Sequence, residues 1–137
     1  MKNKVLQILS KTEFNKTLQR ERIRSARADQ EFSVAMLEVG HVFAVADHSE
    51  SFSHLIGQRI RCYDVIGWLD STIMGMLLPD TAANGAHGLV EDICRSLPDA
   101  LGAIDYSIIE YPSQVVSGKR NANLVCVDVH ELRRTLK

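Results

Sequence analysis

The chain has 137 residues, of which 45% are hydrophobic and 24% are charged, a balance typical of a globular domain. A chain of this length buries roughly two-thirds of its unfolded surface, so one domain without disulfide or metal support is expected. The longest uninterrupted apolar run, residues 73–78, is far shorter than the ~20 residues that cross a bilayer. The apolar stretch at residues 5–9 is too short for a secretory signal. We therefore expect a cytoplasmic protein without membrane insertion.

The formal net charge of −1 conceals an asymmetry along the chain. Residues 1–28 contain eight Lys or Arg and two acids, net +6, whereas residues 29–137 contain eight and fifteen, net −7. No aromatic residues alternate with the arginines, so nucleic acid is not an expected partner. The basic segment is expected to contact a protein partner or a second copy instead.

The cysteines and histidines indicate no metal site. The three cysteines, Cys62, Cys94 and Cys126, are widely spaced and form no CxxC motif, so buried thiols are expected. The five histidines are scattered without the spacing of metal ligands. Neither a metal nor another cofactor is expected.

Local signals predict the secondary structure in chain order. Ser10 and Glu13 have the spacing of a capping box and predict a basic helix over residues 10–28. A compact apolar run predicts a buried strand over 32–39, and apolar residues at helical spacing predict a helix over 49–63. Two short apolar runs, 64–69 and 72–78, predict a β-hairpin that turns at Asp70-Ser71.

The second half continues with the same alternation. Thr81 is expected to cap a helix that Pro98 stops, and residues 104–111 are expected to form a strand. Residues 112–137 are a tail in which 124–129 is predicted as a further strand and 130–137 as a terminal helix.

This order predicts an α+β fold of the ferredoxin-like type. A β-α-β-β-α-β unit forms an antiparallel sheet with helices on one face, preceded by the N-terminal helix. The whole chain is expected to be one domain, with its core over residues 32–111.

The hairpin region resembles a known family. Residues 61–81 (RCYDVIGWLDSTIMGMLLPDT) are similar, without a gap, to the signature region of GGDEF domains, the diguanylate cyclases, whose pattern is RxxDxxxRxGGDEFxxLLPxT. Residues 32–47 resemble the first strand and following turn of that family, and residues 18–28 resemble its preceding basic helix. The resemblance implies the same fold as the periodicity.

The positions that carry catalysis in the family have changed. The GGDEF motif aligns with Asp70, Ser71, Thr72, Ile73 and Met74, so the glycines that let a nucleotide approach the backbone are absent. The metal-binding acid of the family is replaced by Ile73, which supplies no ligand. Glu38 stands at the first-strand aspartate, but Gly40 and Ala46 replace the next aspartate and the guanine-binding asparagine. We expect no catalytic residues and no enzymatic activity.

Arg61-x-x-Asp64 matches the inhibitory site of the family, at which Arg and Asp bind cyclic di-GMP. A guanidinium forks onto a phosphate or a guanine edge, and a carboxylate accepts from guanine N–H groups. The alternative is structural, because Arg61 would end a helix favourably and Asp64 would open a strand. The two interpretations differ in whether these side chains face an open groove or bond locally.

Two classes of function follow from the resemblance. The chain is either a non-catalytic GGDEF-like regulatory domain that senses cyclic di-GMP, or a ligand-free scaffold or protein-interaction module. Similar degenerate domains are associated with sugar transferases of exopolysaccharide synthesis, which makes that pathway the expected context.

Overall fold

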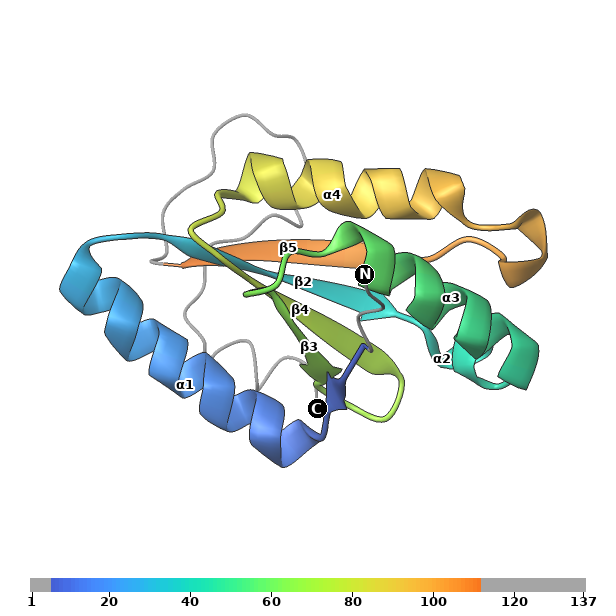
Figure 1. Cartoon of the computed structure of the whole chain (residues 1–137), viewed down its shortest axis with the longest axis horizontal. Coiled ribbons are helices and arrows are strands. Elements are labelled where there is room, and N and C mark those ends of the chain that lie inside the picture. The colour runs from blue at the N-terminus through green and yellow to red at the C-terminus, as the bar shows by residue number, and fades with distance from the viewer. Residues whose placement is uncertain (1–5, 112–137) are drawn as a thin grey trace.

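The computed structural model describes residues 6–111, which form one sheet and its covering helices (Figure 1). The predicted strand over 124–129 and helix over 130–137 lie outside the described residues. None of the described helices combines the length and apolar character that a bilayer crossing needs. In chain order the elements are β1 (Ile8–Leu9), α1 (Lys11–Ala28), β2 (Phe32–Glu38), α2 (Gly40–Phe43), α3 (Ala46–Arg59), β3 (Val65–Trp68), β4 (Ile73–Pro79), α4 (Ala83–Ser96), the 3-10 turn η1 (Asp99–Leu101) and β5 (Tyr106–Tyr111).

The sheet has the strand order β1-β3-β4-β2-β5. Strand β2 lies between β4 and β5 and pairs antiparallel with both, and β3 and β4 form the predicted hairpin. This confirms the α+β fold and its β-α-β-β-α-β order. The short β1 pairs parallel with β3, so the complete sheet is mixed.

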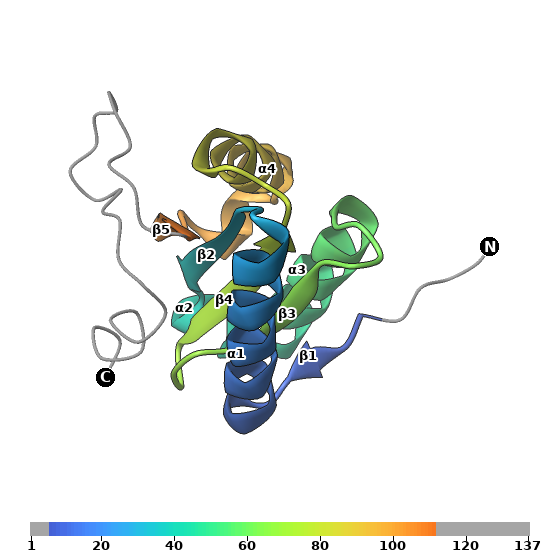
Figure 2. The same cartoon turned by 90° about the vertical axis from the view of Figure 1, so that its left-hand side faces the viewer.

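Helices cover both faces of the sheet. Helices α3 and α4 lie on one face, as predicted, while α1 crosses the opposite face (Figures 1 and 2). Each face has its own buried cluster, the larger one beneath α3 and α4 and the smaller one beneath α1. Because both faces are covered, residues 32–35 of β2 are all buried, Ser33 among them, and residues 34–37 are consecutively apolar instead of alternating.

Helix α1 follows its local sequence signals. The Ser10 side-chain oxygen accepts from the Glu13 N–H at 3.2 Å, and Asp29 ends the helix in the left-handed region with a φ of 58°. Phe14 and Leu18 are fully buried against the sheet. The predicted helix over 10–28 is confirmed.

Three other boundaries differ from the sequence prediction. The helix predicted over 49–63 is α3, which begins at Ala46 and ends at Arg59, and β5 begins at Tyr106. Thr81 does not cap α4. The Glu110 carboxylate, from β5, accepts from the Ala83 N–H at 3.1 Å instead, a contact between elements distant in the sequence.

The hairpin turn is longer than predicted. The N–H groups of Leu69 and Asp70 both donate to the Ile73 carbonyl, at 2.8 and 3.2 Å. Pairing therefore continues to Ile73, and the turn consists of Asp70, Ser71 and Thr72. The prediction of a two-residue turn at Asp70-Ser71 is wrong, because Thr72 belongs to the turn and not to the second strand.

Phe14 of α1 lies on a pair of glycines in the hairpin. Gly67 and Gly75 are directly opposite each other in the β3–β4 register. A Cβ added at Gly67 would lie 2.5 Å from the Phe14 ring, and one added at Gly75 would lie 2.6 Å from it. The ring thus occupies space that any other pair of residues would fill, and this contact sets how closely α1 approaches the sheet.

We predict that Gly75→Ala lowers the free energy of unfolding by about 1–3 kcal/mol, because an overpacked core must shift its neighbours. Gly67→Ala should act in the same way. Denaturant unfolding followed by circular dichroism measures the effect. Gly88→Ala is the matched control, because nothing lies within 4 Å of its added Cβ and alanine favours the helix by up to ~1 kcal/mol. A Gly75→Ala variant as stable as the parent protein would contradict this packing.

Candidate functional site

Arg61 and Asp64 bond to each other in the loop between α3 and β3. The Asp64 Oδ2 accepts from the Arg61 backbone N–H at 2.8 Å and from its Nε at 3.2 Å. The Arg61 Nη2 donates to the Asp64 Oδ1 at 2.9 Å. Both carboxylate oxygens are therefore engaged by one arginine, in the two-pronged geometry that planar guanidinium favours.

The same arginine joins this loop to the segment that follows β4. Its Nη2 also donates to the Pro79 carbonyl at 3.2 Å and to the Thr81 hydroxyl at 2.7 Å. We call Arg61, Asp64, Pro79 and Thr81 the arginine clamp. Thr81 was predicted as a helix cap, but its hydroxyl accepts from Arg61 and donates to the Pro79 carbonyl, so the clamp holds it.

The two charges of the clamp differ in exposure. The Asp64 side chain is 1% exposed, whereas that of Arg61 is 43% exposed. The hydrogen bond that Arg61 donates to Asp64 raises the pKa of Arg61, and the guanidinium lies over the Tyr63 ring, 4.6 Å from its centroid, where a cation is attracted. Asp64 is thus a buried internal partner, and Arg61 presents part of its surface to solvent.

Local bonding is the outcome that the structural interpretation of Arg61-x-x-Asp64 anticipated, but its mechanism differs. Arg61 lies beyond α3 in a turn closed by the Asp64 N–H, which donates to the Arg61 carbonyl at 3.1 Å. The charge pairing therefore replaces the expected interaction with the helix dipole.

The positions equivalent to the GGDEF motif form the turn and the start of β4. The Asp70 Oδ1 accepts from the Ser71 N–H at 2.7 Å, which stabilises the turn. Ile73 lies directly opposite Glu38 in the β2–β4 register, and Met74 is 1% exposed in the core. The acidic residue that the family places at the fourth position would thus lie beside Glu38.

Thr72 lies over the end of β2. The Val39 N–H donates to the Thr72 carbonyl at 2.9 Å, and the Thr72 hydroxyl donates to Glu38 Oε1 at 3.4 Å. A Cβ added at Gly40 would lie 2.9 Å from the Thr72 methyl group. Within residues 6–111, no three His, Cys, Asp or Glu side chains are grouped in a way that could hold a metal ion.

A polar cluster on α4 and β5 was missed by the sequence analysis. The Tyr106 hydroxyl lies 2.9 Å from His87 Nδ1 and donates to Glu91 at 3.4 Å. Burial, and then the nearby Glu91 charge, raise the pKa of Tyr106 to about 12. The His87 and Glu91 spacing of four on one helix is a signal in the sequence, whereas Tyr106 approaches only through the fold.

Several solved structures that are similar to this chain are GGDEF domains or diguanylate cyclases. A DGC protein from Thermotoga maritima has a TM-score of 0.63 at 15% identity, covering 79% of this chain and 85% of that one. The GGDEF domain of DgcB from Caulobacter crescentus, in complex with c-di-GMP, has a TM-score of 0.59 at 16% identity, covering 79% and 75%. The chain has a GGDEF-like fold.

A third similar structure is a two-protein complex. The diguanylate cyclase SiaD from Pseudomonas aeruginosa, in complex with its activator SiaC, has a TM-score of 0.61 at 20% identity, covering 86% of this chain. The chain spans 51% of SiaD. Comparison of the sequence with protein-family models finds no match, and comparison with curated proteins finds none either. At identities of 15–20%, the similarity to these structures shows the fold alone.

We predict that Arg61→Met lowers the free energy of unfolding by about 1.5–3 kcal/mol, because it removes charge-assisted hydrogen bonds from a buried carboxylate. Arg59→Met is the matched control. The Arg59 ion pair with Asp92 spans 2.9 Å between side chains that are 33% and 49% exposed, so its loss should cost no more than about 1 kcal/mol. If denaturant unfolding shows that both substitutions lower the free energy of unfolding equally, the stabilising role of the clamp is contradicted.

Proposed function

We propose that this chain is a non-catalytic GGDEF-like regulatory domain that acts in the cytoplasm through contacts with other proteins. The observation that carries the proposal is the pairing of Glu38 with Ile73 across β2 and β4. Two-metal phosphoryl transfer needs clustered carboxylates that hold the cations. Here a branched apolar side chain stands where the second carboxylate would lie.

The turn supports the same proposal. In the family, the glycines of the hairpin let GTP approach the backbone, and here Asp70, Ser71 and Thr72 stand in the turn. The Thr72 side chain lies against Gly40 and Glu38.

The chain should therefore make no cyclic di-GMP from GTP and Mg²⁺. Loss of a single contact that stabilises charge in the transition state costs about 10²–10³-fold in rate, and both the acidic residue and the glycine turn are absent. Chromatography of the products after prolonged incubation of the purified chain measures this. An active diguanylate cyclase run in parallel shows that the assay detects turnover.

Ile73→Glu extends this test. The substitution places a second carboxylate opposite Glu38 but leaves the turn unchanged, so we expect it to restore no turnover. Cyclic di-GMP formed by the unmodified chain would overturn the proposal. Formation by the Ile73→Glu variant would show that the turn accepts GTP and that the loss is confined to one side chain.

A scaffold role in exopolysaccharide synthesis remains part of the proposal. It rests on the resemblance of residues 61–81 to the GGDEF-like regions associated with sugar transferases. Hydrogen bonds within the fold fix both the clamp and the hairpin turn. The surface around them is therefore rigid, and a rigid surface loses little entropy when it binds another protein.

A second candidate function is the sensing of cyclic di-GMP through Arg61. It is favoured by the 43% exposure of the Arg61 side chain and by its position over Tyr63, which is 52% exposed. A planar guanidinium above an aromatic ring is suited to a phosphate or a guanine edge. Asp64 could join such a contact only by giving up bonds to Arg61.

Calorimetric titration with cyclic di-GMP separates the two candidates. For a sensor we expect saturable binding that Arg61→Ala abolishes and Arg61→Lys partly restores, because lysine lacks the planar fork. The ligand should also raise the melting temperature, since it binds only the folded state. A titration without saturable heat well above micromolar concentration leaves the protein-interaction role as the function.

A further inference from the structure

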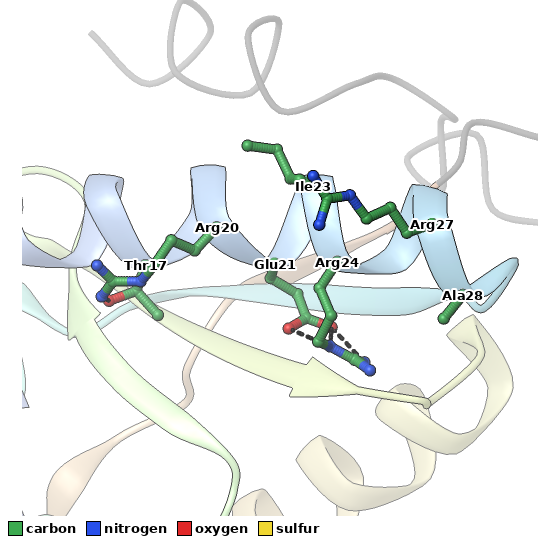
Figure 3. A pocket seen from close by; sticks show the side chains of 7 residues that line it. All are labelled: Thr17, Arg20, Glu21, Ile23, Arg24, Arg27 and Ala28. Atoms are coloured by element: carbon green, nitrogen blue, oxygen red, sulfur yellow. Dashed lines mark hydrogen bonds and ion pairs between the residues drawn. The ribbon is translucent and has the colours of Figure 1, made fainter.

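The outer face of α1 combines positive charge with an exposed apolar side chain. Helix α1 contains six Lys or Arg and two Glu, net +4. Ile23 is 56% exposed at its surface. Figure 3 shows the side chains of this surface. Its residues, which we call the basic face, are Thr17, Arg20, Glu21, Ile23, Arg24, Arg27 and Ala28.

The charges of the basic face are not all neutralised within the fold. Arg24 pairs with Glu21 at 2.8 Å and with Asp80 at 3.3 Å. Within residues 6–111, neither Arg20 nor Arg27 forms an ion pair with an acid. Figure 3 shows Arg24 turned toward Glu21, while Arg27 lies near Ile23. Arg27 therefore lies beside an exposed apolar side chain, while Arg20 lies beside Thr17 earlier on the same helix. Both carry charge that no acid of residues 6–111 pairs.

The remainder of the described chain is strongly acidic. Residues 29–111 contain thirteen Asp or Glu and three Arg, net −10. Several of these acids lie where β2 ends and β4 and β5 begin: Glu38 ends β2 opposite Ile73, the first residue of β4, and Asp105 directly precedes β5. We call this surface the acidic end; its members are Glu38, Asp47, Asp70, Asp99 and Asp105.

Backbone hydrogen bonds and close contacts bring the segments of the acidic end together. The Glu38 N–H donates to the Asp105 carbonyl at 2.9 Å, and Val39 bonds to the hairpin turn that contains Asp70. A Cβ at Gly102, just after η1, would lie 3.6 Å from His41 of α2. Asp47, Asp99 and Asp105 are exposed. Arg95, in the last turn of α4, is already paired with Glu91 at 3.5 Å.

We infer that the basic face of one copy docks on the acidic end of a second copy. The half of α1 that carries Arg20 and Arg27 lies toward the opposite end of the molecule from the acidic end (Figure 1), so one copy cannot satisfy both surfaces itself. Opposite charge on two separate surfaces produces a head-to-tail contact, which adds copies successively. Residues 112–137 contain five Lys or Arg and two acids, so their charge does not complement the basic face.

This inference names the partner in the interaction role proposed above, and it is independent of cyclic di-GMP. The cyclase assay tests the proposed lack of catalysis, whereas measurements of self-association test this contact, so the two can fail separately. Complementary charge at an exposed contact is weakened by salt. The assembly should therefore form at low ionic strength and dissociate as salt is added.

Sedimentation velocity of the full chain, over a range of concentrations at about 20 and 300 mM salt, tests the contact. We expect association at low salt that weakens at least about tenfold at high salt. Arg20→Glu together with Arg27→Glu should abolish it, and Asp99→Lys together with Asp105→Lys should do the same. Circular dichroism checks that each variant is folded. The single substitutions Arg20→Glu and Arg95→Glu are matched, because both reverse an exposed helical arginine, and only Arg20→Glu should weaken association.

Mixing the two double variants is the decisive step. Each lacks one surface, so each alone should be a monomer, whereas the mixture retains one intact basic face and one intact acidic end and should form dimers. A protein that is monomeric at every concentration and low salt overturns the inference. Association that survives reversal of the acidic end overturns it as well, as does a mixture that stays monomeric.

Discussion

The contact of Phe14 with Gly67 and Gly75 is the constraint on which the rest of the fold depends. Two glycines facing each other across β3 and β4 leave a depression on the sheet, and one aromatic ring of α1 occupies it. Close packing makes such a position intolerant of added atoms. With α1 held there, the second face of the sheet is buried, and the polar side of α1, with its arginines, is turned outward.

The other end of the hairpin is fixed by charge. The arginine clamp ties the loop before β3 to the residues after β4, so both strands are held at the end opposite the turn. At the turn, Val39 and Glu38 bond to Thr72. Packing, ion pairing and hydrogen bonding thus close the hairpin at three places. These three contacts hold the hairpin within the GGDEF-like fold.

The features that the sequence predicted correctly are those that depend on neighbouring residues. The helix over 10–28 is specified by its own cap and apolar spacing, and the order of strands follows from apolar runs. Arg61 and Asp64 were found through the resemblance, and their proximity follows from their separation of three residues. Whether they face solvent or each other is decided by the fold and could not be derived from the motif.

The missed features depend on residues far apart in the chain. The sequence context of Thr81 predicts a helix cap, but its hydroxyl accepts a hydrogen bond from Arg61, twenty residues earlier. The Glu110 carboxylate accepts from the first N–H of the helix instead. The turn extends to Thr72 because one carbonyl, that of Ile73, accepts two N–H groups. The glycine pair did leave a signal, since Gly67 and Gly75 are equally distant from Ser71 at the centre of the turn.

We propose that the hairpin end, which is closed by its own contacts, binds no GTP. Amide hydrogen exchange of the full chain, with and without GTP and Mg²⁺, tests it most directly at residues 38–41 and 70–74. We predict the same exchange rates in both conditions, because the bonds that close this end are internal. Slower exchange of these two segments only when GTP and Mg²⁺ are present would contradict the account.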